Sequence, residues 1–560
     1  MGKYFVKNKL LFVLYVLAVP CMSIASVLFS YSMAPLFDNA TYESGKMAMH
    51  AVLIFIILAG CDMFFTYIHK IVRENLRCEY LTALKSDTIG GILNMNYEGY
   101  RKNSPAYYIS LFQRDIARIN EDYFDGVCGV YRVITNAITS VAALLMFNPW
   151  ICIVNAVVAA LSVAVPRIFD KKIDEYSEDA SNKASEYQSV LSDVLNGFNT
   201  IRLFSVVEQI KKYVQNRNIS NEKSEMKRIV TNYQYSYLSQ IFTEVGYVFT
   251  LVFGVYLVLN GKMTIGGIIA VSQLAGGILV PFEELPALIT GIKSVESVKK
   301  KVMSFINTKK MADETIESKA LDTDIRLNNV AIKYEDNEVI EGVNMTFKPN
   351  NKYILVGESG SGKSTIAKAI LKMIPIADGN IKIGGKDINV IDENSLYSTI
   401  NYMQQEVFLF DDSIYNNITL YKNHTKEEVD KVIDEAGLTS YINGLPDGVN
   451  TKISGNGYNL SGGEKQRIGI ARSLLAGVKV LVLDEITSNL DAVLAKKIED
   501  AVFGLKDVTV IWITHRITPD TMKKASEVFV IRNGGIAEEG TYDSLMEKKG
   551  IFYSYKTISD

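Results

Sequence analysis

The stretch that decides the fold reads Val356-Gly357-Glu358-Ser359-Gly360-Ser361-Gly362-Lys363-Ser364-Thr365. It fits the phosphate-binding pattern G-x-x-x-x-G-K-[ST], with a buried strand expected before it at 353–356 and a helix after it at 366–373. Its glycines let backbone N–H groups approach phosphate oxygens closely. The alternative is a glycine- and serine-rich turn without function, but a flanking strand and helix are the context that this motif requires. We therefore expect the whole loop to bind ATP.

Polar side chains beside this loop have distinct expected roles. Lys363 is expected to reach the outer phosphates, and the hydroxyl of Ser364 to bind Mg²⁺. Further along, the apolar strand 480–483 ends in Asp484-Glu485. Ligands bind at the carboxyl ends of strands in such sheets, so we expect Asp484 in the Mg²⁺ site and Glu485 as the base for an attacking water. An ordinary junction between a strand and a turn is the alternative.

The composition divides the chain into two halves. The 560 residues include 59 basic and 62 acidic side chains, a balance that gives no indication of nucleic-acid binding. Long apolar runs fill the first half, whereas charged, glycine-punctuated alternation of strands and helices fills the second. The five cysteines all lie in the first half without metal-ligand spacing, so we interpret them as packing residues.

The apolar runs predict a membrane domain. A membrane-spanning helix needs about 20 apolar residues, and the first run is too long for a signal peptide. The third and fourth spans are separated by Asn148-Pro149-Trp150. The six predicted spans are Leu10 to Met33, Met47 to Ile68, two within Val133 to Pro166, Tyr237 to Leu259, and Ile265 to Leu285.

Basic residues predict the orientation of these spans. Lysines and arginines concentrate before the first span and in two long segments, 71–121 and 167–232, whereas the opposite loops carry only Lys46 and Lys262. The positive-inside rule then places both chain termini and both long segments in the cytoplasm, with the protein in the cytoplasmic membrane. We interpret each long segment as a pair of helices that extends the spans, with tips on which another domain docks.

Four acidic residues lie in or beside the predicted spans: Asp62, Glu244, Glu283 and Glu284. Carboxylates at membrane depth are costly and usually serve a transport pathway or a partner. Asp62, near the middle of the second span, is the candidate for lining a substrate cavity. The alternative is a hydrogen bond that fixes helix packing.

A second motif identifies a family. It reads Leu460-Ser461-Gly462-Gly463-Glu464-Lys465-Gln466-Arg467 and resembles the signature sequence of ATP-binding-cassette transporters. The resemblance covers essentially the whole chain and implies a half-transporter of the exporter type. In that family the signature of one subunit, here Ser461, Gly462, Gly463 and Glu464, closes over the nucleotide held by the other. From the residues alone, this glycine-rich helix start is a second site rich in N–H groups that suits an anion.

Other positions match the family in chain order. The resemblance implies that Tyr334 stacks on adenine and that Gln405 touches Mg²⁺ and the attacking water. Gln404 beside it leaves that assignment open by one position. It also implies that His515 contacts the γ-phosphate and that Asp491 belongs to a loop crossing the dimer interface.

The fold class expected is therefore an all-α membrane domain of six helices with long cytoplasmic extensions, followed by an α/β P-loop nucleotide-binding domain. We expect the membrane domain at 1–306, a linker at 307–324 and the cassette at 325–560. Coupling helices that press on the cassette are expected near 110–121 and 201–208. One departure is that the loop 453–457 lacks the acidic residue usual in such exporters.

The expected function is ATP-driven export of a drug-like solute, lipid or peptide by two half-transporters embedded in membrane lipid, as a homodimer or a heterodimer. A leader-cleaving peptide exporter is not expected, because no peptidase segment precedes the first span. The alternatives are import of a metal chelate, a membrane regulator that uses ATP without transport, and a soluble cassette ATPase acting on nucleic acid. The six apolar spans argue against the last.

Overall fold

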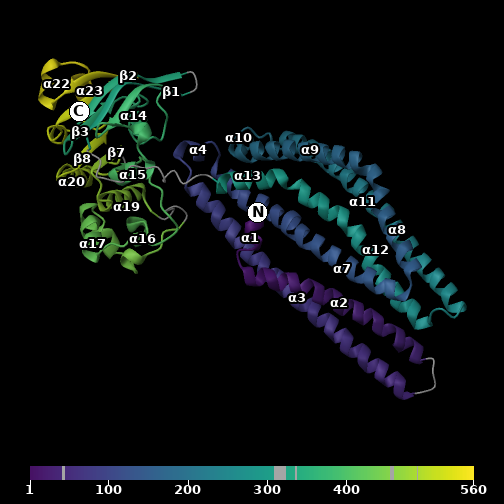
Figure 1. The fold of residues 1–560 in the computed structure, drawn as a ribbon. Helices are drawn as coiled ribbons and strands as arrows, with labels where there is room; N and C mark the ends of the chain where they lie inside the picture. The colour runs from purple at the N-terminus through teal and green to yellow at the C-terminus, as the bar shows by residue number, and fades with distance from the viewer. Residues whose placement is uncertain (41–44, 308–322, 335–336, 455–459, 488–489, 560) are drawn as a thin grey trace. The chain divides into compact units, whose positions relative to one another are not determined.

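The computed structural model describes residues 1–40, 45–307, 323–334, 337–454, 460–487 and 490–559. The chain forms two compact units, drawn in Figure 1. The first contains residues 1–93 and 104–308, and the second contains residues 94–103 and 309–560. Most of the predicted linker, 308–322, lies outside the described residues.

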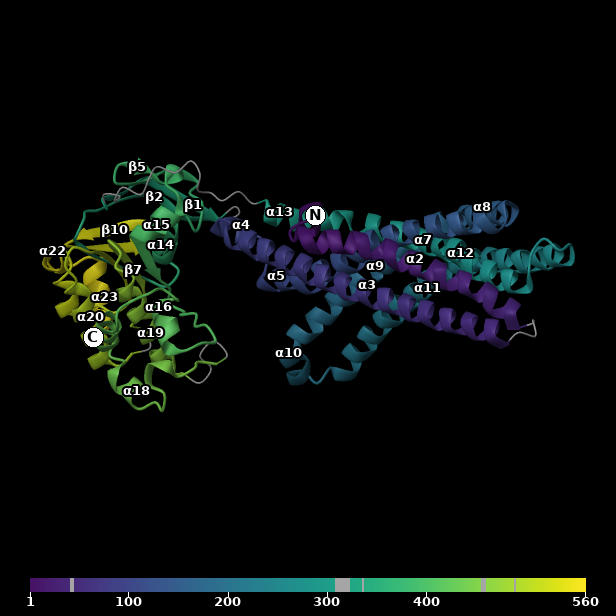
Figure 2. The ribbon, with the colours of Figure 1, turned by 60° about the horizontal axis from the view of Figure 1, so that its bottom comes forward.

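The first unit is helical, as expected. Among the described residues, five helices are long and apolar enough to cross a membrane, and Pro149–Ser162 is a shorter apolar helix. In Figures 1 and 2, α2 and α3 run side by side, and α12 packs against α7. The helices that contain the six predicted spans are α2 (Lys9–Ala40), α3 (Gly45–Leu93), α7 (Asp125–Phe147), α8 (Pro149–Ala164), α11 (Val207–Leu259) and α12 (Ile265–Ser294).

The predicted break between the third and fourth spans is confirmed. Asn148 leaves the helical conformation, and its side chain accepts hydrogen bonds from the backbone N–H groups of Trp150 (2.9 Å) and Ile151 (3.4 Å). Pro149 follows at the first helical position, where its missing N–H costs nothing. The Asn-Pro pair therefore ends α7 and starts α8 within one residue.

Two helices continue far beyond a bilayer. The 49 residues of α3 and the 53 of α11 correspond to about 70–80 Å at 1.5 Å per residue, against a hydrocarbon core of about 30 Å. The second long charged segment is helical, as expected: α9 (Asp170–Asn196) lies along α11, and α10 (Phe198–Leu203) joins them (Figure 2).

The structure places the two predicted coupling segments differently. Residues 110–121 lie inside a helical run that continues into α7 and belongs to the first unit. The short helix that groups with the second unit is α4 (Tyr97–Arg101), which begins at the cap Asn96. The second prediction, 201–208, straddles the turn between α10 and α11. A side-chain cap thus marks the start of α4, whereas α10 begins without one.

The second unit is built on two sheets. The larger has the order β10-β9-β3-β8-β7-β6, with parallel pairing except at the β9–β10 edge, and the smaller has the order β2-β1-β4-β5. The strands are β1 (Ile325–Tyr334), β2 (Asn337–Phe347), β3 (Lys352–Gly357), β4 (Asp378–Ile383), β5 (Lys386–Asp387), β6 (Ile400–Met403), β7 (Val480–Asp484), β8 (Thr509–Ile513), β9 (Glu527–Arg532) and β10 (Gly535–Gly540). The predicted α/β fold is confirmed.

Side chains of the large sheet divide between two apolar cores. Ile354 and Val356 of β3 point into the core shared with the helices α17 (Lys426–Glu435), α19 (Gly462–Leu475) and α20 (Ala492–Phe503). Tyr353 and Leu355, which alternate with them, point into the core shared with the small sheet and α14 (Lys363–Ile370). Because β3 is covered on both faces, its end at Gly357 is held firmly.

A buried asparagine anchors the helices around α19. The amide nitrogen of Asn417 donates to the carbonyls of Phe410 and Ser413, both at 3.0 Å, and its side-chain oxygen accepts from the N–H of Phe410 at 2.8 Å. Nε of Arg472 donates to the carbonyl of Asn417 at 2.8 Å.

We expect Asn417→Ala to lower the free energy of unfolding by about 1–2 kcal/mol, because it leaves buried backbone groups unpaired. Thermal unfolding of the purified protein would show a lower midpoint, whereas Asn423→Ala, at an exposed position, would leave it unchanged. Equal midpoints for both variants would contradict this.

Candidate functional site

The phosphate-binding loop lies between β3 and α14, as predicted. Gly360 and Gly362 have φ angles of 80° and 104°, which L side chains rarely adopt. A Cβ atom on Gly362 would also lie 2.4 Å from Cδ1 of Ile340. Glycine is therefore required there, and the loop backbone turns tightly into the start of α14.

Lys363 lies inside this loop with only 4% of its surface exposed. Its Nζ donates hydrogen bonds to the carbonyls of Gly357 (3.0 Å) and Glu358 (2.8 Å). Burial lowers the pKa of Lys363, while the nearby carboxylates of Glu485 and Asp484 raise it. The loop thus holds an ammonium group where phosphate oxygens would meet it.

Asp484 ends β7 with both carboxylate oxygens engaged. The hydroxyl of Ser364 donates to Oδ1 at 3.0 Å, and the hydroxyl of Tyr402 donates to Oδ2 at 2.8 Å. A hydroxyl and a carboxylate side by side are the hard oxygen ligands that Mg²⁺ prefers. Burial, followed by the charge of Asp484, raises the pKa of Tyr402, so this hydroxyl stays protonated and donates.

Glu485 meets two of the predicted catalytic residues. Its Oε1 lies 2.6 Å from Nε2 of His515, and its Oε2 accepts a 2.9 Å hydrogen bond from the amide of Gln405. The backbone of Glu485 is left-handed, with a φ of 52°, a conformation that clusters at functional sites. The ends of β6, β7 and β8 therefore bring together a base, an amide and an imidazole. The hydrogen bond to Glu485 favours Gln405 over Gln404.

The remaining loop residues surround the lysine. Ser361 is buried, with its hydroxyl 3.4 Å from Nζ of Lys363, and Thr365 is half-buried on α14. Ser359 is exposed. Glu358 accepts a 3.2 Å hydrogen bond from the hydroxyl of Tyr555, on the C-terminal helix α23 (Ile551–Ser559). Sequence reasoning did not indicate this contact between the end of the chain and the loop.

The signature motif forms the start of α19. Ser461 is the N-cap, and its Oγ accepts from the N–H of Glu464 at 3.3 Å. In return, the carboxylate of Glu464 accepts from the N–H of Ser461 at 2.7 Å. This capping box leaves the first-turn N–H groups of Gly462 and Gly463 for an anion. Glu464 caps the helix within its own chain, and its place at the partner's nucleotide stays a prediction.

Three further predictions concern parts of the second unit. Asp491 caps α20, accepting a 2.9 Å hydrogen bond from the N–H of Leu494. Its loop neighbours 488–489 and residues 455–457 of the loop before the signature lie outside the described residues. Tyr334 ends β1, but its side chain also lies outside them, so its stacking on adenine stays a prediction.

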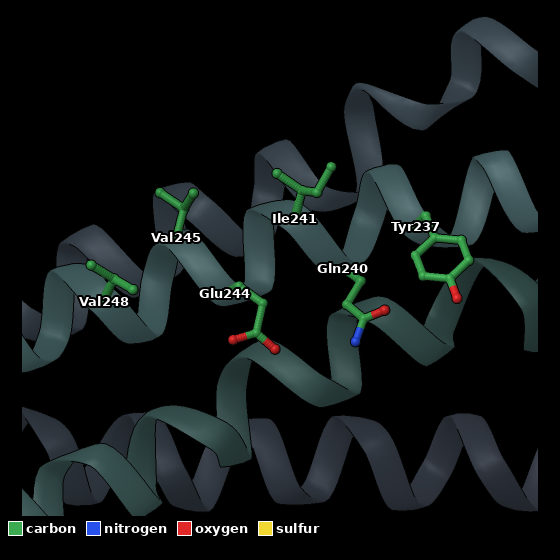
Figure 3. Close-up of a pocket in the computed structure, with 6 residues that line it drawn as sticks. All are labelled: Tyr237, Gln240, Ile241, Glu244, Val245 and Val248. Atoms are coloured by element: carbon green, nitrogen blue, oxygen red, sulfur yellow. The ribbon is translucent and has the colours of Figure 1, made fainter.

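The acidic residues of the membrane helices have different surroundings. Glu284 of α12 forms an ion pair with Arg132 of α7 at 2.7 Å. Glu244 lies on an exposed face of α11, where it lines a shallow pocket, and Figure 3 shows it pointing the same way as Gln240. Asp62 lines a separate cavity inside the first unit, as predicted.

Fold and site together define an ATPase of the P-loop class that carries a helical membrane domain. Comparison with known proteins identifies the family within this class. The ABC transporter transmembrane region model matches residues 10–282, and the ABC transporter model matches residues 340–488.

Relatives match over nearly the whole chain. The ATP-dependent lipid A-core flippase of Syntrophus aciditrophicus (strain SB) is 24% identical over 96% of this chain and 91% of that protein. The Lactococcin-G-processing and transport ATP-binding protein LagD of Lactococcus lactis subsp. lactis is 25% identical over 95% of this chain and 76% of its own length. The fold matches a bacterial Atm1-family ABC exporter with ATP bound, with a TM-score of 0.81 and 20% identity over 99% of this chain and 98% of that one.

The chain belongs to the ABC transporter family and is a half-transporter, with one membrane domain and one ATP-binding cassette. It is an ATP-hydrolysing transporter.

Tyr402 is the site residue that sequence reasoning missed. Its hydroxyl holds the carboxylate that is expected at Mg²⁺, so we expect Tyr402→Phe to leave that carboxylate freer to turn. The Mg²⁺ concentration for half-maximal ATPase should rise about 3- to 10-fold, the effect of one lost hydrogen bond. Tyr415→Phe, on a half-buried tyrosine of the same unit, is the matched control. Identical Mg²⁺ curves for both variants would count against this role.

Proposed function

We propose that two copies of this chain, or this chain and a sister subunit, export a solute across the cytoplasmic membrane. In each composite site, the phosphate-binding loop of one subunit would hold ATP and the Ser461 end of α19 from the other would cover it. The observation that supports this is the second anion-binding helix start. Among the described residues, its capping hydrogen bonds stay within the motif, and Ser461 forms no hydrogen bond to the phosphate-binding loop of its own chain.

The site residues would act in sequence during one cycle. Lys363 and the loop N–H groups bind the phosphates, and the first-turn amides of Gly462 and Gly463 from the second subunit complete the enclosure. Ser364 and Asp484 would hold Mg²⁺, which neutralises charge on the phosphate oxygens. Glu485 then orients and deprotonates the attacking water, and His515 donates to the γ-phosphate. Loss of that phosphate removes the contacts that held the two subunits together.

The short helices at the tips of the long segments would transmit the movement of the cassettes to the membrane domain. We propose α4 and α10 for this role in place of 110–121 and 201–208, because α4 groups with the second unit and α10 has the same place in the other long segment. The basic residues of these segments support cytoplasmic tips and cytoplasmic chain termini. The names of the two relatives, a lipid A-core flippase and a Lactococcin-G-processing and transport protein, support a lipid or peptide as well as a drug-like solute.

Cross-linking tests the shared site. If this chain works as a homodimer, chains that carry Ser359→Cys should form disulfide-linked dimers with chains that carry Ser461→Cys. We expect the amount of linked dimer to increase when ATP is added. Single variants alone are the controls, because each offers only one of the two cysteines at the closed site. A sister subunit carrying the matching cysteine tests the heterodimer. Absence of ATP-dependent linkage in both pairings would contradict the proposal.

A further inference from the structure

A polar cavity of about 320 Å³ is lined by residues of four helices of the membrane domain, α2, α3, α7 and α12, which Figure 1 labels. Its volume is at the lower end of the range for sites that take small organic molecules. Apolar side chains, including Phe29, Val27 and Leu274, line part of it. The polar residues that line it are Ser23, Ser26, Ser30, Asp62, Thr66, Asn136, Thr139, Ser140 and Gln273.

Several of these polar groups present acceptors to the cavity. The hydroxyl of Ser30 gives its proton to the carbonyl of Ser26 at 2.9 Å, and Thr139 gives its proton to carbonyls of its own helix. Ser23 donates to the side-chain oxygen of Asn136. A hydroxyl whose proton is engaged can still accept hydrogen bonds through its lone pairs. These engaged hydroxyls can therefore accept hydrogen bonds from a ligand that brings donors.

The charge of the cavity lining also favours a ligand with donors, and in particular a cation. Asp62 is the one charged residue of the lining, which contains no lysine, arginine or histidine. Within the described residues, Asp62 has no hydrogen bond or ion pair, whereas Glu284 of the same domain pairs with Arg132 at 2.7 Å. A carboxylate at membrane depth without a partner is costly, so a bound cation would relieve that cost.

A metal ion suits this cavity less well than an organic cation. Nowhere in the described residues do three or more His, Cys, Asp or Glu side chains come together to hold a metal. A single carboxylate surrounded by hydroxyl groups and an apolar wall instead matches an ammonium group on a compact apolar body.

We propose that this cavity binds a compact organic ammonium ion, with Asp62 as its counter-ion and the hydroxyl oxygens of Ser30 and Thr139 as acceptors for its N–H groups. As an assignment of the exported substrate class, this rests on the proposed function. Binding itself does not depend on ATP hydrolysis and can be measured separately.

Three probe molecules of the same shape test whether the cavity prefers an ammonium group to a neutral or an anionic group. Adamantylamine, adamantanol and adamantane carboxylate share an apolar cage and differ in charge, and the amine is protonated at pH 7 as a lysine side chain is. We would measure equilibrium binding to the full-length protein in nanodiscs of zwitterionic lipid, subtracting empty nanodiscs. The amine is expected to bind at least about tenfold more tightly than the alcohol, as for a charged hydrogen-bonded pair. The carboxylate is expected not to bind.

Two variants test whether the amine binds at Asp62. Asp62→Asn keeps the shape of the side chain and should weaken amine binding about tenfold or more, whereas Glu244→Gln, a second membrane carboxylate outside the cavity, should not. Equal binding of the amine and the alcohol, or unchanged amine binding in Asp62→Asn, would overturn the assignment. Failure of the proposed function would appear differently, as absent ATP-dependent transport by protein that still binds the amine.

Discussion

Glu485→Gln is expected to slow ATP hydrolysis by about 10²- to 10⁴-fold while ATP still binds. An amide keeps the size of the side chain and can still hydrogen-bond to Gln405 and His515, but it cannot take a proton from water. In the unchanged protein, Oε2 of Glu485 lies 2.9 Å from the amide nitrogen of Gln405, and Oε1 lies 2.6 Å from Nε2 of His515. The phosphate-binding loop is untouched by the change, so binding and chemistry should separate.

The measurement has two parts. Phosphate release by purified protein in detergent gives the rate, and binding of a fluorescent ATP analogue gives the affinity. Glu547→Gln, at an exposed position on α22 (Tyr542–Lys548), is the matched control for the loss of one carboxylate. A hydrolysis rate within a few-fold of the unchanged protein would remove Glu485 from its assigned role.

The parts of the candidate nucleotide site can be predicted from the sequence because each of them is local. The loop, the strand ending in Asp484 and the helix start at Ser461 each lie within one short stretch with a recognisable pattern. The Ser461-x-x-Glu464 spacing is itself a capping-box pattern, so the capping role of Glu464 could have been predicted from the residues. The family resemblance directed attention to the nucleotide instead.

Contacts between distant strands could not be predicted in this way. Tyr402 reaches Asp484 because β6 and β7 pair in parallel, with Met403 opposite Leu483, a register that no local pattern specifies. The same holds for the ion pair between Arg132 and Glu284, which are 152 residues apart. The tip helix α4 has a local signal in its cap Asn96, but the predicted coupling segment lies further along the chain, at 110–121.

Lys363→Ala is expected to weaken ATP binding by about 10²-fold or more and to abolish hydrolysis at cellular ATP concentrations. The ammonium group donates to the carbonyls of Gly357 and Glu358 inside the loop, where it is placed to meet the outer phosphates. Charge-assisted hydrogen bonds to phosphate are among the stronger polar contacts, and alanine removes them together. Because the side chain is buried, water cannot fully replace it.

Titration with the fluorescent ATP analogue measures this loss, and it should exceed any loss in Glu485→Gln, since one residue serves binding and the other serves chemistry. Lys368→Ala, five residues further along α14, is the matched control for removal of a lysine from the same helix. An affinity for ATP equal to that of the control would mean that the loop backbone binds the phosphates without its lysine. The enclosure of ATP would then depend on the N–H groups of the two helix starts alone.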